Sequence, residues 1–487
     1  MFEKRYFSES HKHNLPTIRI QKMVLHNFKS VKHGELVFNC GKEFIPYGTK
    51  ADILGVYGQN GSGKTAIIEA LSILRFLMCG DKLPNIYADC IPPNEGFSQL
   101  SFTFELQYPD GQIRKVEYSF CLSAEELLQN NTKKLDLTEL EDDFSPNGMT
   151  IHVFNEVLRV AGDIDGEKKT IKPFIDTSRE NMPFSSKKKM EQIIGKDKKI
   201  LIQLEVNKQL AYERSKSFIF MTDTIKLIGD TQVVSEYFRI ILELHLFSNY
   251  YFFVVDTKFS GLIRLNVGIP LYTEHGALHL KAYKPTTIPT EIFNMFRMQF
   301  DSINLVLSQL VPGLSIGLRS LSPTLMKDGK EARIVEAVAS RNGIELPLRS
   351  ESDGIRKIIS ILALIIAVYN QQSCTVAIDE FDAGIFEYLL GEILQTIEES
   401  GKGQFIFTSH NLRPLEIIDK KYLYFTTTNP ENRYIHMKSI GKSNNLRNVY
   451  FREILMNEQD EEIYSRTKRY KIVDALRKAG ETNEEEA

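Results

Sequence analysis

The sequence has few cysteines, and their arrangement excludes the covalent and metal cross-links on which small secreted domains depend. There are five in 487 residues, an odd number, and no two of them form a C-x-x-C pair. We therefore expect neither a disulfide framework nor a zinc site. The cysteines are Cys40, Cys79, Cys90, Cys121 and Cys374.

Long apolar runs and a strong net charge are also absent. The longest apolar stretch, residues 358–368, is shorter than the about 18 residues that a membrane-spanning helix needs. The chain opens with Met1-Phe2-Glu3-Lys4-Arg5 and not with a signal peptide, which predicts a cytoplasmic protein with no membrane partner. The formal net charge is only −3, so a nucleic-acid surface would have to be a local patch.

The sequence does contain a glycine-rich loop typical of phosphate binding. Residues 58–65 follow the pattern G-x-x-x-x-G-K-[ST], between an apolar run at 53–57 and an apolar-periodic segment at 66–78. This order predicts strand, loop and helix, with backbone N–H groups and the helix N-terminus around a pyrophosphate. Lys64 would reach the β- and γ-phosphates, and the Thr65 hydroxyl would bind Mg²⁺. The predicted nucleotide-binding residues are Gly58, Asn60, Gly61, Ser62, Gly63, Lys64 and Thr65.

Two later strands carry the groups that hydrolysis of a nucleotide would need. The apolar run 375–378 ends in Asp379 and Glu380, the Walker B arrangement. Asp379 would hold the Mg²⁺ shell, and Glu380 would polarise the attacking water. The next apolar run, 404–408, ends in a serine followed by His410, which would contact the γ-phosphate. The chain contains no Asn-Lys-x-Asp motif for guanine, so ATP is the predicted nucleotide.

The distribution of patterns predicts an α/β fold whose P-loop core is divided by an insertion. Alternating segments at 18–25, 35–38, 100–106 and 113–122 predict antiparallel strands beside the P-loop. The predicted divisions are the first half of the ATPase at 1–122, a mostly helical insertion with some strands at 123–309, the second half at 310–440, and a helical tail at 441–487.

A basic segment within the insertion has two interpretations. Clustered lysines next to an amphipathic helix at 200–210 can form a solvated helical face, or they can contact the phosphate backbone of DNA without reading its sequence. Both interpretations remain open. The lysines are Lys187, Lys188, Lys189, Lys196, Lys198 and Lys199.

The order of these motifs resembles that of the ABC ATPase superfamily. P-loop, Ser-x-Gly before a helix, apolar-Asp-Glu, Phe-Asp-Ala-Gly and strand-Ser-His follow one another as in that group. The long separation of Lys64 from Asp379 excludes a transporter subunit. The opening Asn27-Phe28-Lys29-Ser30 and the large insertion resemble the RecF/SMC/OLD branch. Within it the chain is most similar to stand-alone AAA-type ATPase subunits of bacterial anti-phage systems (OLD-like, Septu-like and PARIS-like), which work with a separate nuclease.

The resemblance implies roles for further residues. Ser352 and Gly354 match the signature loop, which would face ATP bound by another protomer, although Asp353 and Ile355 depart from the usual residues there. Asp382 matches the D-loop position. Lys29 would approach the base or phosphates of ATP, whereas the Q-loop glutamine is undecided between two candidates. These candidates are Gln99 and Gln107.

A signature loop that works on another protomer implies a head-to-tail homodimer or larger oligomer with ATP at its interface. Such ATPases often use closure to act on a partner, so hydrolysis is expected to be slow. The leading hypothesis is a defence ATPase that senses phage or foreign DNA and controls a separate nuclease. The alternative is a RecF-like repair ATPase that binds duplex DNA. Genomic neighbours would discriminate between them, since a nuclease gene favours the first and replication genes the second.

Overall fold

The computed structural model describes most of the chain, and all structural statements refer to that part. Residues 1–14 and 482–487, at the two ends of the sequence, lie outside it. The described residues are 15–38, 50–126, 148–164, 167–180, 182–231, 233–256, 268–273, 276–281, 285–326, 329–437, 445–456 and 459–481.

A six-stranded, mainly parallel sheet lies at the centre of the molecule. Its order is β18-β17-β3-β16-β15-β8, and every neighbouring pair is parallel except β17 and β18. The apolar runs before the P-loop and before Asp379 therefore lie in one sheet, separated by a single strand. The strands are β3 (Asp52–Tyr57), β8 (Phe252–Val255), β15 (Thr375–Ile378), β16 (Gln404–Thr408), β17 (Leu423–Thr426) and β18 (Tyr434–Ile435).

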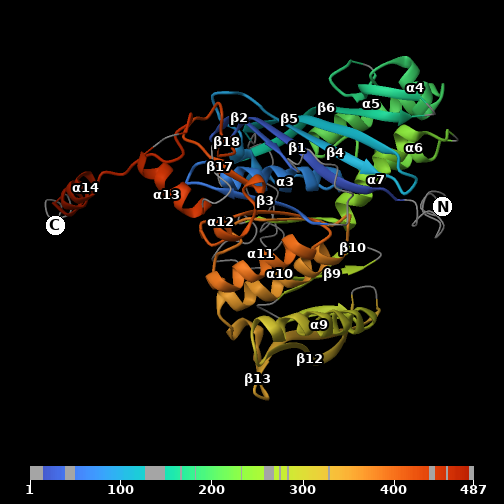
Figure 1. Ribbon diagram of the computed structural model, residues 1–487. Coiled ribbons are helices and arrows are strands. Elements are labelled where there is room, and N and C mark those ends of the chain that lie inside the picture. Colours follow the sequence, from blue (N-terminus) through green and yellow to red (C-terminus); the bar gives the residue numbers. More distant parts are fainter. Residues whose placement is uncertain are drawn as a thin grey trace.

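Both faces of this sheet are apolar, because successive side chains of a strand point to opposite sides. In β15, Ala377 belongs to the core on one face, and Val376 and Ile378 belong to the core on the other. The first core contains α3 (Lys64–Met78), and the second contains α10 (Asp353–Asn370) and α11 (Glu387–Ser400). Figure 1 shows α3 above the sheet and α10 and α11 below it.

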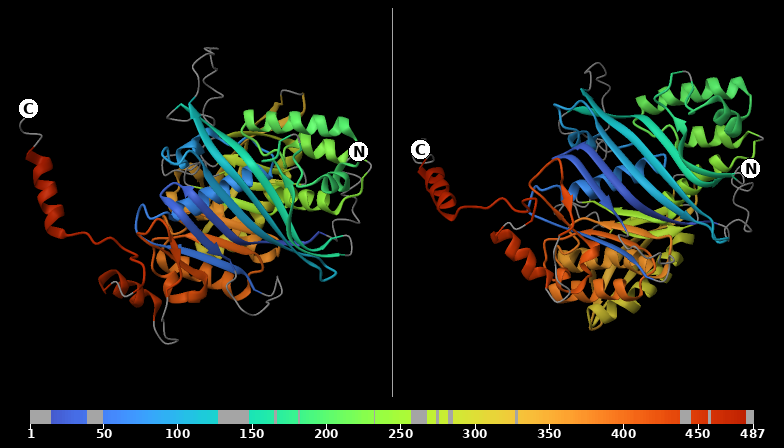
Figure 2. Two further views of the ribbon diagram at one scale, coloured as in Figure 1. Left: turned by 90° about the horizontal axis from the view of Figure 1, so that it is seen from above. Right: turned by 45° about the horizontal axis from the view of Figure 1, so that its top comes forward.

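A second six-stranded sheet, entirely antiparallel, covers α3 from the other side. Its order is β2-β1-β4-β5-β6-β7, and Figure 2 shows its long strands crossing the top of the molecule. The four strands expected before residue 122 are present. The strands are β1 (Thr17–Phe28), β2 (Val31–Val37), β4 (Ser98–Gln107), β5 (Ile113–Glu126), β6 (Met149–Ile164) and β7 (Glu167–Asp176).

The segment 123–309, predicted as a mostly helical insertion with some strands, contains both helices and strands. It contributes β6 and β7 to the antiparallel sheet and β8 to the central sheet, so it is built into both sheets. Four of its described helices gather at one end of the antiparallel sheet and beside α3 (Figure 1). They are α4 (Lys187–Ile194), α5 (Lys198–Glu213), α6 (Thr222–Gly229) and α7 (Glu236–Tyr250).

A smaller lobe lies below α10. Helix α9 (Thr290–Leu310) packs its buried side, with Phe296, Phe300 and Leu307, against a third sheet, as its apolar spacing predicts. That sheet is formed by β11 (Thr286–Pro289), β12 (Leu314–Leu325), β13 (Glu331–Arg341) and β14 (Ile344–Pro347), and a separate hairpin by β9 (Gly268–Thr273) and β10 (Gly276–Lys281).

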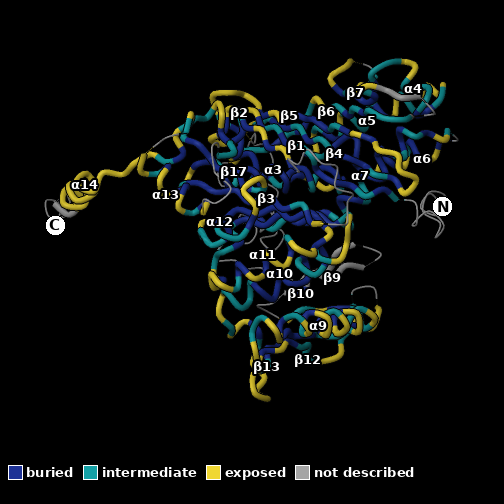
Figure 3. The backbone as a smooth tube through the Cα atoms, in the orientation of Figure 1, coloured by how far each residue is buried: buried dark blue, intermediate teal, exposed yellow. Residues whose placement is uncertain are grey.

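The remaining elements are short turns and the C-terminal helices. Helix α14 stands away from the body in all views (Figures 1 and 2), and its residues 469–479 are exposed (Figure 3). Within the described part of the chain, every helix is too short or too polar to traverse a bilayer. These elements are η1 (Asn85–Cys90), η2 (Leu348–Ser350), α12 (Pro414–Ile417), η3 (Lys420–Tyr422), α13 (Leu446–Met456) and α14 (Arg469–Glu481).

One buried arginine joins the antiparallel sheet to the central sheet. The Arg19 side chain of β1 is 1% exposed, and its Nε lies 3.3 Å from the Asp52 carboxylate at the start of β3. The same guanidinium donates to the carbonyl of Cys374 (3.3 Å) and to that of Lys402 (2.5 Å). Burial raises the pKa of Asp52, and the Arg19 charge opposes that rise. A single side chain thus binds the amino ends of three neighbouring parallel strands.

Candidate functional site

The P-loop runs from the end of β3 into α3, as the sequence pattern predicts. Gly63 caps α3 with a φ of 95°, a conformation that a side chain disfavours. Gly58 is required for a different reason, because an added Cβ would lie 1.6 Å from Thr426 Oγ1 on β17. Gly58 therefore allows the loop to pass directly beside the neighbouring strand.

The C-terminal part of the chain holds this loop in place. Ser62 donates to the Gln59 carbonyl (2.6 Å) and shares a 2.5 Å hydrogen bond with Thr426 Oγ1. The Tyr434 hydroxyl on β18 donates to the Gly63 carbonyl (2.8 Å). Nothing in the local P-loop pattern indicates these partners, because they lie more than 360 residues further along the chain.

Lys64 lies within the loop and close to the acidic residues of the site. Its Nζ donates to the carbonyls of Gly58 (2.8 Å) and Gln59 (3.0 Å). Burial lowers the pKa of Lys64, while the carboxylates of Asp379, Glu380 and Asp382 act in the opposite direction. The structure thus brings together the P-loop lysine and the acidic residues that follow β15.

Asp379 and Glu380 follow β15 at the same sheet edge as the P-loop, since parallel strands β3, β16 and β15 end together. Asp379 is 4% exposed, and its Oδ1 accepts a 2.5 Å hydrogen bond from the Thr408 hydroxyl. That hydroxyl accepts from the Glu380 N–H (2.8 Å). Thr408, the last residue of β16, therefore orients both predicted Walker B residues. The sequence analysis did not single it out.

Glu380 has a left-handed backbone conformation and is supported by the signature helix. Its φ is 46°, which is uncommon for a residue other than glycine, asparagine or aspartate. Lys357, on the first turns of α10, donates from Nζ to the Glu380 carbonyl oxygen. Burial lowers the pKa of Lys357, and the carboxylates of Asp382, Glu380 and Asp379 oppose that shift. Lys357 was not predicted, because its role depends on how α10 packs against the sheet.

Asp382 holds the loop that contains His410. Its carboxylate accepts from the His410 N–H (3.1 Å to the nearer oxygen) and from the Asn411 N–H (2.9 Å). His410 itself is exposed and follows β16 at the edge shared with the P-loop. The predicted D-loop aspartate and switch histidine are therefore connected within one chain.

The signature residues begin α10 on the opposite side of the central sheet from α3. Ser352 is exposed and caps the helix, accepting from the Ile355 N–H at 3.4 Å. Asp353 is also exposed and pairs with Arg356. An added Cβ at Gly354 would lie 2.0 Å from the Gly384 carbonyl oxygen, so the signature and the D-loop region touch through their backbones.

Lys29 directly follows β1, and the two glutamine candidates lie on β4. Lys29 Nζ forms a 2.6 Å ion pair with Glu69, on the second turn of α3, and its φ is 53°. Gln99 is exposed on β4, and Gln107 contacts Glu105 on the same strand. The roles predicted for these side chains remain predictions.

A buried carboxylate at the end of β8 was missed by the sequence analysis. Asp256 is 4% exposed and follows β8, the neighbour of β15. It accepts a 3.0 Å hydrogen bond from the Tyr87 hydroxyl, which also lies 2.6 Å from Ser72 Oγ of α3. An apolar strand followed by an aspartate is the same signal that identified Asp379. Here it went unused because the strand lies within the predicted insertion.

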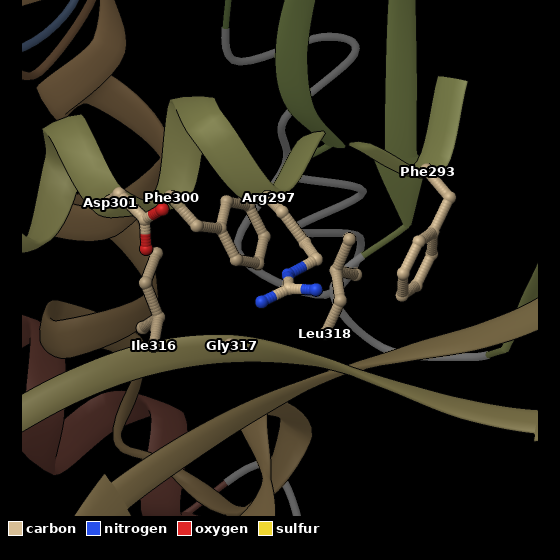
Figure 4. A pocket seen from close by; sticks show the side chains of 7 residues that line it. All are labelled: Phe293, Arg297, Phe300, Asp301, Ile316, Gly317 and Leu318. Carbon is tan, nitrogen blue, oxygen red and sulfur yellow. The ribbon is translucent and has the colours of Figure 1, made fainter. Parts of the chain in front are cut away.

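A separate groove of about 290 Å³ lies in the lower lobe, between α9 and β12. Figure 4 shows the Arg297 guanidinium between the helix and the strand, beside Phe300 and Leu318. Figure 1 places α9 and β12 below α10, on the side of the central sheet away from α3. The groove is therefore distinct from the P-loop site.

Comparisons with known proteins agree with the nucleotide-binding assignment. The AAA domain family model matches residues 22–245, just under half of the chain, and this segment includes the P-loop. No curated protein has significant sequence similarity to the chain.

Several solved structures are similar to this one at low sequence identity. An SMC head bound to the C-winged helix domain of ScpA has 14% identity and a TM-score of 0.39, covering 86% of this chain and 97% of its own. The SMC head domain from Thermotoga maritima has 15% identity and a TM-score of 0.34, covering 86% and 100%. The recombination mediator RecF with ATP has 12% identity and a TM-score of 0.31, covering 81% and 94%.

Taken with the family match, the geometry defines a P-loop site of the ATP-binding class on a mixed α/β core. The predicted mixed α/β fold with an antiparallel lobe is confirmed. The groups present also suit ATP with Mg²⁺. Gly58 passes close to β17, Lys64 provides a positive charge within the loop, and Thr65 and Asp379 carry oxygen atoms of the kind that Mg²⁺ prefers.

Proposed function

We propose that this protein is an ABC-type ATPase in which two copies enclose ATP between the P-loop of one and the signature loop of the other. The observation that carries the proposal is the placement of the signature residue Ser352, which is exposed at the start of the helix on the opposite face of the central sheet from the P-loop helix. The P-loop, Asp379, Glu380 and His410 follow strands that end at one sheet edge, whereas exposed Ser352 begins a helix on the opposite face from α3. One chain then provides two half-sites.

In this mechanism Lys64 and the N-terminus of α3 would bind the phosphates, and Thr65 and Asp379 would hold Mg²⁺. The metal would neutralise phosphate charge.

Glu380, held by Thr408 and Lys357, orients and deprotonates the water. The exposed Ser352 supplies a hydroxyl to ATP on the other copy. Loss of the γ-phosphate removes contacts that favour the closed dimer, so nucleotide state sets the assembly state.

We further propose that the protein senses phage or foreign DNA and that closure of its dimer controls a separate nuclease in antiviral defence. Its hydrolysis of ATP would be slow. The support is the motif order and the Asn27–Ser30 opening. Lys64→Ala and Glu380→Gln, placed in the native gene cluster, are expected to abolish protection against phage. Phage sensitivity that is unchanged by deletion of the gene and its neighbours would exclude the defence role.

The biochemical test compares wild type with Glu380→Gln. Light scattering should show that ATP and Mg²⁺ double the mass of the variant stably and that of the wild type only transiently. Turnover should fall about 100-fold or more in the variant, since it loses the general base. If the mass in solution does not change with ATP and Glu380→Gln hydrolyses ATP at the normal rate, the residues of the nucleotide site are assigned wrongly.

A RecF-like ATPase that binds duplex DNA is the second candidate, because an exposed basic surface is present. Five lysines on or next to α4 and α5 are exposed, whereas Lys189 packs its Nζ 3.8 Å from the centre of the Tyr237 ring. Steeply salt-dependent DNA binding that is lost on charge reversal of the exposed lysines would favour this candidate. They are Lys187, Lys188, Lys196, Lys198 and Lys199.

A further inference from the structure

Helix α14 carries an apolar face that the body of the described chain leaves exposed. Ile472, Val473 and Leu476 lie on one side of the helix, and Leu476 is 71% exposed. Lys471 and Lys478 lie on the other side. A helix of this length is only marginally stable alone in water, so packing of the apolar face would contribute most of its stability.

The segment that leads to α14 runs along the nucleotide site. The Thr428 N–H donates to the Glu462 carbonyl (2.7 Å), which holds the segment against the loop after β17. The Ser465 N–H then donates to Gln59 Oε1 (2.7 Å), a side chain of the P-loop itself. The chain therefore leaves the body beside the P-loop and projects outward as α14 (Figure 1).

The proposed ATP-enclosing dimer sets the P-loop of one copy against the signature loop of the other, so the exit of α14 beside the P-loop would lie near that signature loop. The signature loop touches Gly384 through Gly354, and two large exposed aromatic residues lie within the four positions after Gly384. Phe386 is 75% exposed and Tyr388 is 60% exposed. These two aromatic side chains and the exposed carboxylates of Glu387 and Glu392 form a surface that we call the α11 patch. The α11 patch consists of Phe386, Glu387, Tyr388 and Glu392.

The charges of the two surfaces are complementary. Residues 466–481 contain six lysines and arginines but only two acidic residues, Asp474 and Glu481, whereas the α11 patch contains two glutamates. Opposite charge steers association and fixes orientation, and burial of apolar and aromatic side chains supplies affinity.

From these observations we infer that α14 docks on the α11 patch of a second copy of this chain when ATP closes the dimer. The inference rests on the proposed ATP-enclosing dimer. A two-fold interface repeats every contact, so α14 of each copy would bind the α11 patch of the other. The docking of α14 would then depend on whether ATP is bound, since the segment that leads to α14 contacts the P-loop side chain of Gln59.

The test uses two full-length proteins, both with Glu380→Gln, mixed with ATP and Mg²⁺. One carries Leu476→Cys and the other Tyr388→Cys, so that a disulfide between the introduced cysteines can form only between copies. Mild oxidation is expected to give a covalent dimer that requires ATP. The matched control replaces Leu476→Cys by Lys471→Cys on the opposite side of α14, which should give little dimer. Each protein with one introduced cysteine, oxidised alone, controls for disulfides that involve the native cysteines. Of these, the described Cys90, Cys121 and Cys374 are buried.

A second measurement follows the same contact without cross-linking. Leu476→Glu should weaken the ATP-dependent dimer at least about tenfold, the factor that corresponds to burying one leucine side chain. Lys471→Gln should change the dimer affinity little.

An ATP-dependent dimer with no disulfide, or with equal yields from both α14 positions, would overturn the docking and leave the ATP-enclosing dimer intact. No ATP-dependent dimer at all would overturn both. Binding of α14 to anionic vesicles or to a nuclease, with dimer affinity unchanged in Leu476→Glu, would replace the second copy by that partner.

Discussion

Glu380 occupies a left-handed backbone conformation between Thr408, which binds its N–H, and Lys357, which binds its carbonyl. Such a conformation costs about 1–3 kcal/mol and persists only where the surroundings enforce it. The two side chains provide that enforcement from β16 and from α10. The residue that would orient water is therefore held from the strand and the helix that lie on either side of it.

Lys357→Met is expected to lower kcat about 10- to 100-fold with little change in KM for ATP, because it removes a charge-assisted hydrogen bond from Glu380 but touches no predicted phosphate ligand. Lys357→Arg should retain part of the activity. Arg356→Met is the matched control, since it removes a neighbouring positive charge that pairs with Asp353. Equal losses in both methionine variants would indicate a general effect of charge on α10 and not a positioning role for Lys357.

At the scale of elements, α3 depends on α7 for the end distant from the nucleotide. His245 of α7 donates from Nδ1 to the carbonyl of Met78, the last residue of α3 (2.8 Å). Burial lowers the pKa of His245 below its ordinary value of 6.5, although the Met78 carbonyl opposes the shift. The P-loop helix is thus bound at its C-terminal end by a neutral histidine.

The pH dependence of stability follows from this shift. A lowered pKa means that the unfolded chain binds a proton near pH 6.5 that the folded chain binds only at lower pH. The stabilising contribution of His245 is therefore present above pH 6.5 and is lost as the pH falls below it. His245→Gln should show a smaller drop in Tm between pH 7.5 and 5.5 than wild type. His410→Gln, at an exposed histidine, should retain the wild-type drop; a drop in Tm that is unchanged in His245→Gln would contradict the assignment.

The elements that could be predicted from sequence are those with a local signal. Residues 58–65 specify their loop through glycine and lysine spacing, and 375–378 and 404–408 are apolar runs of strand length. The strand β8 was not placed, although it is an apolar run of the same length as β15, because it lies within the predicted insertion and pairs with β15 far along the chain. β6 and β7 were not located individually, although some strands were predicted in this segment, because their sheet partners are fixed by packing.

The candidate site shows the same limit. Asp379 and Glu380 could be predicted because they directly follow an apolar strand. Lys357 and Thr408 could not, because their contacts depend on how a helix and a neighbouring strand lie against that turn.

At the scale of the whole molecule, the enclosing of ATP by two copies predicts complementation between inactive variants. Lys64→Ala and Ser352→Glu should each be inactive. In their mixed dimer one composite site carries both defects and the other carries none. Random mixing in equal amounts should therefore restore about a quarter of the wild-type turnover.

The matched control mixes Lys64→Ala with Glu380→Gln, whose defects lie on the same side of each site. Every composite site of that mixed dimer remains defective, so no activity should return. Equal recovery in both mixtures, or none in the first, would exclude a signature loop that works on the other copy.

The contact of Arg19 with the amino ends of β3, β15 and β16 has a practical consequence for measuring motion. That edge of the central sheet is fixed by one buried cation, whereas the loops that would respond to ATP leave from the opposite edge. The Arg19 edge is therefore a suitable internal reference frame. Spectroscopic labels placed near it should stay at constant mutual distances through the ATP cycle, so that any change measured from there to α10 or α14 reports the moving parts alone.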